Sequence, residues 1–176
     1  MGVKRVIKKA TNRLKKFFKA LVLKERSPKV LAMSFCVGVF IAFSPFVGLH
    51  TAMIFLISWL FSLNFAVTLS ASLFINNPWT MAPVYSVDYF FGEWFFNKLL
   101  GLNSLSLNPC WMEPLNGLIS KYTGIAGISF WSFMVGGNLL GLLVSAILYP
   151  VVRFVFERMS ENMHNKDTNK NARVKW

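Results

Sequence analysis

The main thing that this chain of 176 residues lacks is charge in its first half. Between Lys29 and Asp88 there is no aspartate, glutamate, lysine or arginine. A soluble domain keeps charge out of its core but carries it on its surface every few residues, because only buried charges are costly. Residues 30–87 therefore have no face suited to water, and we expect lipid to be their solvent.

The chain also lacks the motifs of catalysis. Its two cysteines, Cys36 and Cys110, form no Cys-x-x-Cys pair, no metal-ligand spacing and no disulfide framework. A P-loop, a nucleophile elbow, a His/Glu metal motif and a usefully spaced pair of carboxylates are all missing from the sequence. His50 with Asp88 is too small a set to indicate a metal site. We therefore expect no enzymatic activity, no cofactor and no bound metal.

What the sequence does have is positive charge, gathered at its two ends. The net charge is +10 over residues 1–29, −1 over residues 30–152 and +3 over residues 153–176. Basic flanks around an apolar body follow the positive-inside rule, and no nucleic-acid-binding motif accompanies them. The sequence predicts a cationic cytoplasmic leader, a membrane domain and a polar cytoplasmic tail over these ranges. We expect a multi-pass protein of the bacterial inner membrane, with both termini cytoplasmic and nucleic acid excluded as a partner.

The leader has the pattern of an amphipathic helix. From Val3 to Val22 apolar side chains recur three or four residues apart, and lysines and arginines fill most of the remaining positions. Such a helix can lie on a bilayer with anionic headgroups. It can also pack on the protein's own cytoplasmic side. The side chains expected to contact lipid headgroups are Lys8, Lys9, Lys15 and Lys16.

The apolar body is not a set of smooth spans. Residues 51–75 and 125–152 are each long enough to cross a hydrocarbon core of about 30 Å, whereas residues 30–49 are interrupted by proline and glycine. Residues 79–100 mix aromatic side chains with Asp88 and Glu93 and are expected to span or half-span the membrane. The predicted fold is an all-α integral membrane protein with about four short or broken transmembrane or re-entrant helices after the cationic helix. The alternative is two full spans with two interfacial pieces.

Small residues recur every fourth position in two of these segments. Membrane helices with such stripes can approach each other closely and gain van der Waals contact. We expect these helices to pack on each other or on a second subunit, which would make a homo-oligomer. The stripes are Ser34, Gly38 and Ala42 in the first segment, and Gly137, Gly141 and Ser145 in the last.

Two polar interruptions contain proline and are the predicted functional features. Proline removes a backbone donor and frees a carbonyl, and such groups are tolerated at membrane depth where protein or a water-filled cavity satisfies them. The alternative is that they are interfacial turns, in which Asn76, Asn77 and Thr51 cap helices and His50 lies at the headgroups. The predicted helix breaks are Pro45, Gly48, Pro78 and Pro83. The candidate lining of a polar cavity is Ser44, His50, Asn77, Thr80 and Asp88.

At these breaks the chain resembles a bacterial membrane-protein family catalogued as domain of unknown function 2062. The resemblance covers roughly residues 20–155 and rests on four features. These are Ser27-Pro28, Gly38 with Phe40, the run Pro45-Phe46-Val47-Gly48-Leu49-His50-Thr51, and the run Asn77-Pro78-Trp79-Thr80-Met81-Ala82-Pro83-Val84-Tyr85. The family brings no established activity. The fusion of some relatives to glycosyltransferase domains implies work associated with the cell envelope.

Two functions fit these features. A carrier for a small solute or a lipid would use the proline-broken helices, as many transporters use paired broken helices to form a substrate site. A non-catalytic membrane scaffold would instead use the basic helix to recruit a cytosolic enzyme of envelope biogenesis. The sequence names no substrate.

Overall fold

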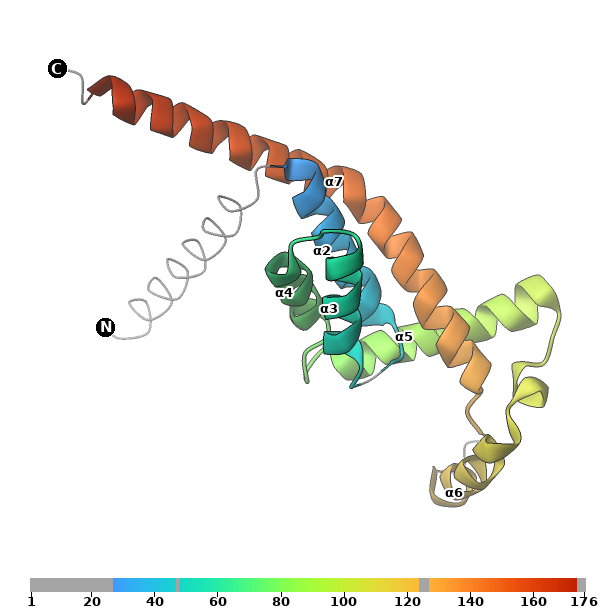
Figure 1. Ribbon diagram of the computed structural model, residues 1–176. Coiled ribbons are helices and arrows are strands. Elements are labelled where there is room, and N and C mark those ends of the chain that lie inside the picture. The colour runs from blue at the N-terminus through green and yellow to red at the C-terminus, as the bar shows by residue number, and fades with distance from the viewer. Residues whose placement is uncertain (1–26, 47, 124–126, 174–176) are drawn as a thin grey trace, which may run out of the picture.

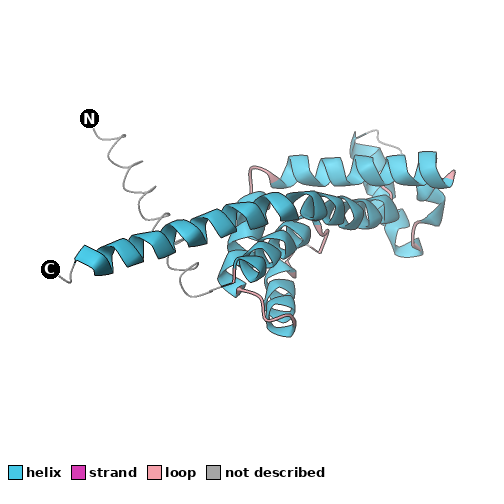
Figure 2. Ribbon diagram, turned by 90° about the horizontal axis from the view of Figure 1, so that it is seen from above, coloured by secondary structure: helices cyan, strands magenta, loops and turns pink. Residues whose placement is uncertain are grey.

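The computed structural model describes residues 27–46, 48–123 and 127–173, with side chains described up to residue 162 apart from that of Thr123. The predicted cationic helix and its four lysines lie outside the described residues. The described chain is helical, with no β-strand in it, which confirms the all-α prediction (Figure 2). The helices are α2 (Pro28–Phe43), α3 (His50–Leu60), α4 (Phe65–Ile75), α5 (Met81–Trp94), α6 (Glu113–Thr123) and α7 (Phe130–Arg173).

Helix α2 is at the centre of the helical body (Figure 1). Along one side it runs antiparallel to α7, since Gly141 contacts Phe40 near the end of α2 and Ser145 bonds to Cys36 earlier in it. Along another side it runs parallel to α4, beginning with the Ser34 hydroxyl, which accepts the backbone N–H of Asn64 at 2.8 Å. The buried residues at the N-terminal end of α2 complete a small apolar core with α4 and α7. Its members are Leu31, Ala32, Val67 and Phe156.

The prediction of one spanning helix over residues 51–75 is wrong. The chain turns between α3 and α4, which form a hairpin beside α2 (Figure 1). At the turn Ser62 has φ 51°, in the left-handed region that ends helices. Asn64 then caps α4, its side-chain oxygen accepting the backbone N–H of Val67 at 3.2 Å. Each arm of 11 residues extends only about 16 Å.

Of the described helices, α7 is the one that is both long and apolar enough to cross a membrane, over Phe130–Asn162. Helices α2, α3 and α4 are apolar but shorter. Helix α7 contains Pro150, and it changes direction along its length (Figure 1). Prolines are a common cause of such bends because they remove an intrahelical hydrogen bond. Helix α7 continues to Arg173, so the predicted polar tail, which starts at residue 153, begins as a continuation of this helix.

The ambiguous aromatic segment is helical. Helix α5 begins after Thr80 and passes into a π-helical stretch, Phe95–Leu100, that ends at Gly101 with φ 64°. Two 3-10 turns, Ser104–Leu107 and Cys110–Met112, lead on to α6. Pro83 lies within the first turn of α5, where the backbone N–H groups lack intrahelical partners in any case. The prediction of a break at Pro83 is therefore wrong, whereas Pro45, Gly48 and Pro78 lie in turns between helices.

Many large apolar side chains are exposed, and the buried positions include polar side chains beside the apolar core. Trp59, Phe74 and Trp79 are 74%, 79% and 91% exposed, and they are three of many large apolar side chains on the surface. Buried positions include Asp88 and several hydroxyl residues. These are Ser34, Ser44, Ser58, Thr68, Ser72, Ser104, Ser129, Ser132 and Ser145.

Candidate functional site

Helices α5 and α7 touch through their backbones at glycine. A Cβ on Gly136 would lie 2.0 Å from the Asp88 carbonyl oxygen, and one on Gly92 would lie 1.8 Å from the Ser132 carbonyl oxygen. Real Cβ atoms do not approach other atoms so closely, so only glycine permits this crossing. The contact brings Asp88 against the second turn of α7 and fixes the position of its side chain.

The Asp88 side chain is fully buried and has no hydrogen-bond partner on either carboxylate oxygen. Its Oδ2 atom lies 3.4 Å from the position that a Cβ on Gly137 would take, and the Phe43 carbonyl oxygen lies 2.4 Å from the same point. Pro45 Cδ also lies 3.4 Å from it. The carboxylate of α5 therefore meets the C-terminal end of α2 in front of Gly137. We call this meeting point the Asp88 junction.

The end of α2 is shaped by its sequence. Pro45 cannot continue the hydrogen-bonding ladder, and Ser44 adopts an extended conformation after donating its N–H to the Ile41 carbonyl at 3.0 Å. His50 Nε2 donates to the Ser44 carbonyl at 2.9 Å, across the turn to α3. The Ser44 hydroxyl oxygen is buried and has no hydrogen-bond partner. Ser44 and His50 are thus connected by a direct hydrogen bond, and Ser44 directly follows the Phe43 carbonyl at the junction.

Asn77 and Thr80 lie elsewhere. The Asn77 side-chain oxygen accepts the N–H groups of Trp79 and Thr80 at 3.0 and 3.1 Å, and its amide donates to the Phe74 carbonyl at 3.1 Å. The Thr80 hydroxyl donates to the Ile75 carbonyl. Thr80 precedes Asp88 by about 12 Å along α5. Their polar groups hold the turn between α4 and α5, so the structure does not gather all five predicted residues into one cavity.

The capping roles proposed in the alternative interpretation are partly present. Asn76 is the C-terminal cap residue of α4, and its side-chain amide donates to the Tyr85 hydroxyl at 3.1 Å. Helix α3 begins at His50 after Leu49, so Thr51 is not its cap. At the start of α2, Ser27 occupies the cap position without a side-chain hydrogen bond.

Glu93, the second carboxylate of α5, contrasts with Asp88. Its Oε1 atom accepts the hydroxyl groups of Ser104 at 2.5 Å and Ser132 at 2.7 Å, and its Oε2 atom accepts the Asn97 amide at 2.9 Å. Ser132 lies in the first turn of α7, where the positive end of the helix dipole favours a carboxylate. Glu93 thereby ties α5 to the start of α7. Sequence reasoning could not find this network, because its hydroxyl donors, Ser104 in a 3-10 turn and Ser132 at the start of α7, lie 11 and 39 residues along the chain from Glu93.

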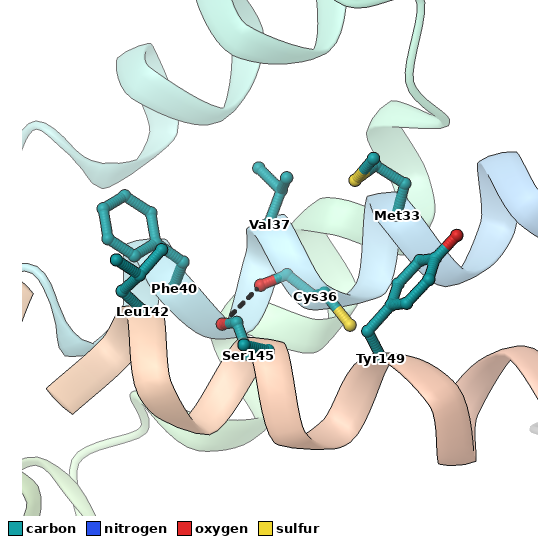
Figure 3. A pocket seen from close by; sticks show the side chains of 8 residues that line it. Met33, Cys36, Val37, Phe40, Leu142, Ser145 and Tyr149 are labelled. Carbon is teal, nitrogen blue, oxygen red and sulfur yellow. Dashed lines mark hydrogen bonds between the residues drawn. The ribbon is translucent and has the colours of Figure 1, made fainter. Parts of the chain in front are cut away.

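The two stripes of small residues face different partners. A Cβ on Gly38 would lie 2.3 Å from the Thr68 carbonyl oxygen, so the stripe of Ser34, Gly38 and Ala42 lies on the buried side of α2 toward α4. On α7, Gly137 and Gly141 contact Phe43 and Phe40 of α2. Ser145 donates to the Cys36 carbonyl at 2.9 Å (Figure 3).

An apolar groove runs along the surface between α2 and α7. Its volume is about 480 Å³, and its wall is formed by apolar side chains with the Ser145 hydroxyl at its base (Figure 3). A second groove of about 570 Å³ lies on the other side of Met33 and Val37, toward α3. Neither groove is lined by Asp88, Phe43 or Gly137. No group of three histidine, cysteine or carboxylate side chains that could hold a metal ion occurs within the described residues.

Residues 11–164 match the model of the family described as uncharacterized protein conserved in bacteria (DUF2062). The chain belongs to this family. The resemblance stated from the sequence motifs is thereby confirmed, and the family description carries no activity and no location. No curated protein and no solved structure matches the chain. The Asp88 junction therefore has to be interpreted from its own chemistry.

Proposed function

We propose that this family member is a multi-pass protein of the bacterial inner membrane that carries a small polar solute or a lipid. The observation that carries the proposal is a fully buried carboxylate without a partner, held where a proline ends an apolar helix. An ionisable side chain inside a membrane domain is costly and is retained mainly where it serves a substrate or ion pathway. Glu93 does not make this case, since hydrogen bonds satisfy its carboxylate.

The distribution of side chains supports the membrane part of the proposal. Soluble monomers rarely expose apolar patches larger than a few hundred Å². Here large apolar residues face outward on α3, α4, α5 and α7, while hydroxyl groups and Asp88 face inward. Close helix contacts through Gly38, Gly92 and Gly136 fit packing in lipid, where small residues let backbones approach. The basic leader would keep the start of α2 at the cytoplasmic face.

The scaffold remains the second candidate because of the leader. A net charge of +10 over residues 1–29 is suited to anionic headgroups or to an acidic cytosolic partner, such as an envelope-biogenesis enzyme. A scaffold would not need the Asp88 carboxylate. The two functions therefore depend on different residues of the same chain.

Complementation of a deletion strain with a measurable phenotype separates them. For a carrier, Asp88→Asn should abolish complementation at normal membrane abundance, because it keeps the side-chain volume but removes the charge. Glu113→Gln is the matched control, since Glu113 is an exposed carboxylate on α6. For a scaffold, the combined change of Lys8, Lys9, Lys15 and Lys16 to glutamate should abolish complementation while Asp88→Asn has no effect. Full activity of Asp88→Asn would rule out the carrier as proposed.

A further inference from the structure

Three buried oxygen atoms have no hydrogen-bond partner: Oδ1 and Oδ2 of Asp88, and Oγ of Ser44, the residue that follows Phe43 in the chain. Both residues are fully buried. Among the residues with described side chains, no lysine, arginine or histidine forms an ion pair with Asp88. Buried polar atoms are normally hydrogen-bonded, and a carboxylate left alone in an apolar environment is strongly destabilising. A positively charged partner would offset the cost of burying the Asp88 carboxylate.

The backbone at the junction adds negative potential. Carbonyl groups at the C-terminal end of a helix have no intrahelical partner and carry the negative end of the helix dipole. The Phe43 carbonyl belongs to this end of α2. Its oxygen and Oδ2 of Asp88 both lie in front of Gly137, 2.4 and 3.4 Å from the position that a Cβ there would take. Pro45 prevents the next turn of helix from covering these carbonyls. The Asp88 carboxylate and the Phe43 carbonyl are both hydrogen-bond acceptors, and the structure places no hydrogen-bond donor against the carboxylate.

We propose that the Asp88 junction binds a sodium ion through the Asp88 carboxylate, the Phe43 carbonyl and the Ser44 hydroxyl. All of these ligand atoms are oxygens, which suit a hard cation rather than zinc or copper. A single carboxylate balances a single positive charge, whereas a divalent ion would leave a buried net charge. Broken helix ends with exposed carbonyls coordinate sodium ions or protons in many transporters. The inference rests on the proposed function and identifies the coupling ion of that carrier.

Binding can be measured on the full-length protein purified in detergent, without knowledge of its substrate. Thermal unfolding would be followed at fixed pH and ionic strength in NaCl, KCl or choline chloride. A ligand that binds only the folded state raises the melting temperature, and saturating sodium should raise it by about 3 °C or more. The rise should occur in the wild type and in Glu113→Gln and should be absent in Asp88→Asn. Ser44→Ala should need a higher sodium concentration for the same rise.

Equilibrium binding of radioactive sodium to the wild type provides a second measurement that needs no variant. We expect saturable binding of about one ion per chain, competed by unlabelled sodium but not by choline. The proposal is overturned if sodium neither binds nor shifts the melting temperature, if potassium acts equally well, or if Asp88→Asn responds like the wild type. A protein that responds to pH but not to sodium would also overturn it, since Asp88 would then hold a proton. A negative result leaves the complementation test of the carrier unaffected, so the two failures are distinguishable.

Discussion

Asp88 and Glu93 show how two carboxylates on one helix acquire different roles. Both interrupt an otherwise apolar segment and are intramembrane candidates if that segment spans the membrane, but only Asp88 belongs to the predicted lining of the polar cavity. Glu93 meets hydroxyl donors from the 3-10 turn and the start of α7, whereas Asp88 meets the backbone of Gly137 and the carbonyl end of α2. The difference lies in partners that are distant in sequence. The sequence therefore predicted the carboxylate but not its surroundings.

Gly136 provides a test at the scale of a single residue. Gly136→Ala would place a Cβ 2.0 Å from the Asp88 carbonyl oxygen, so α5 and α7 would have to move apart. Overpacking of this kind costs about 1–3 kcal/mol, and we expect a lower melting temperature in detergent. Gly117→Ala is the control, because a Cβ there would meet nothing within 4 Å. It should be neutral or stabilise α6 by up to about 1 kcal/mol. Equal stability of the two variants would contradict the close crossing.

At the scale of helices, sequence patterns identified the apolar segments better than their boundaries. The segments that became α2 and α7 were recognised from hydrophobicity and small residues. The turn between α3 and α4 was missed because Ser62-Leu63-Asn64 contains neither proline nor glycine, and the run appeared continuous. Its signal was Asn64, a favoured capping residue. Pro83 was misassigned as a break because a proline in the first helical turn has the same local sequence as one in a loop.

The α3–α4 hairpin predicts a specific exposure. Asn64 bonds to Ser34, which lies in the N-terminal half of α2, so the turn at Ser62 returns toward the end of α2 at which that helix begins. In a protein with Cys36 and Cys110 replaced, Ser62→Cys should react with a membrane-impermeant maleimide in inside-out vesicles. Gly48→Cys, at the opposite end of α3, should not react there and is the matched control. Labelling of Ser62→Cys only from the periplasmic side would contradict a hairpin that returns to the cytoplasmic face.

At the scale of the whole molecule, the outward-facing apolar surface is the main feature that composition did anticipate. A charge-free stretch predicts lipid as the solvent but does not tell which faces of the helices contact it. In the structure the outward faces of α3, α4 and α7 carry exposed apolar side chains, among them Phe55, Leu73 and Ile147. The buried faces of the helices, which carry the hydroxyl groups, pack against each other. That assignment depends on tertiary packing, which hydrophobicity alone does not encode.

The central claim is that these exposed faces lie in the hydrocarbon core of a membrane. Spin labels on Phe55→Cys, Leu73→Cys and Ile147→Cys, in the protein lacking native cysteines and reconstituted in lipid, measure it most directly by electron paramagnetic resonance. Collisions with oxygen should be frequent and collisions with a water-soluble nickel chelate rare at all three positions, while Glu113→Cys on α6 should show the reverse balance. Frequent collisions with the nickel chelate at all three positions would show that water covers these faces and would contradict a membrane-embedded carrier.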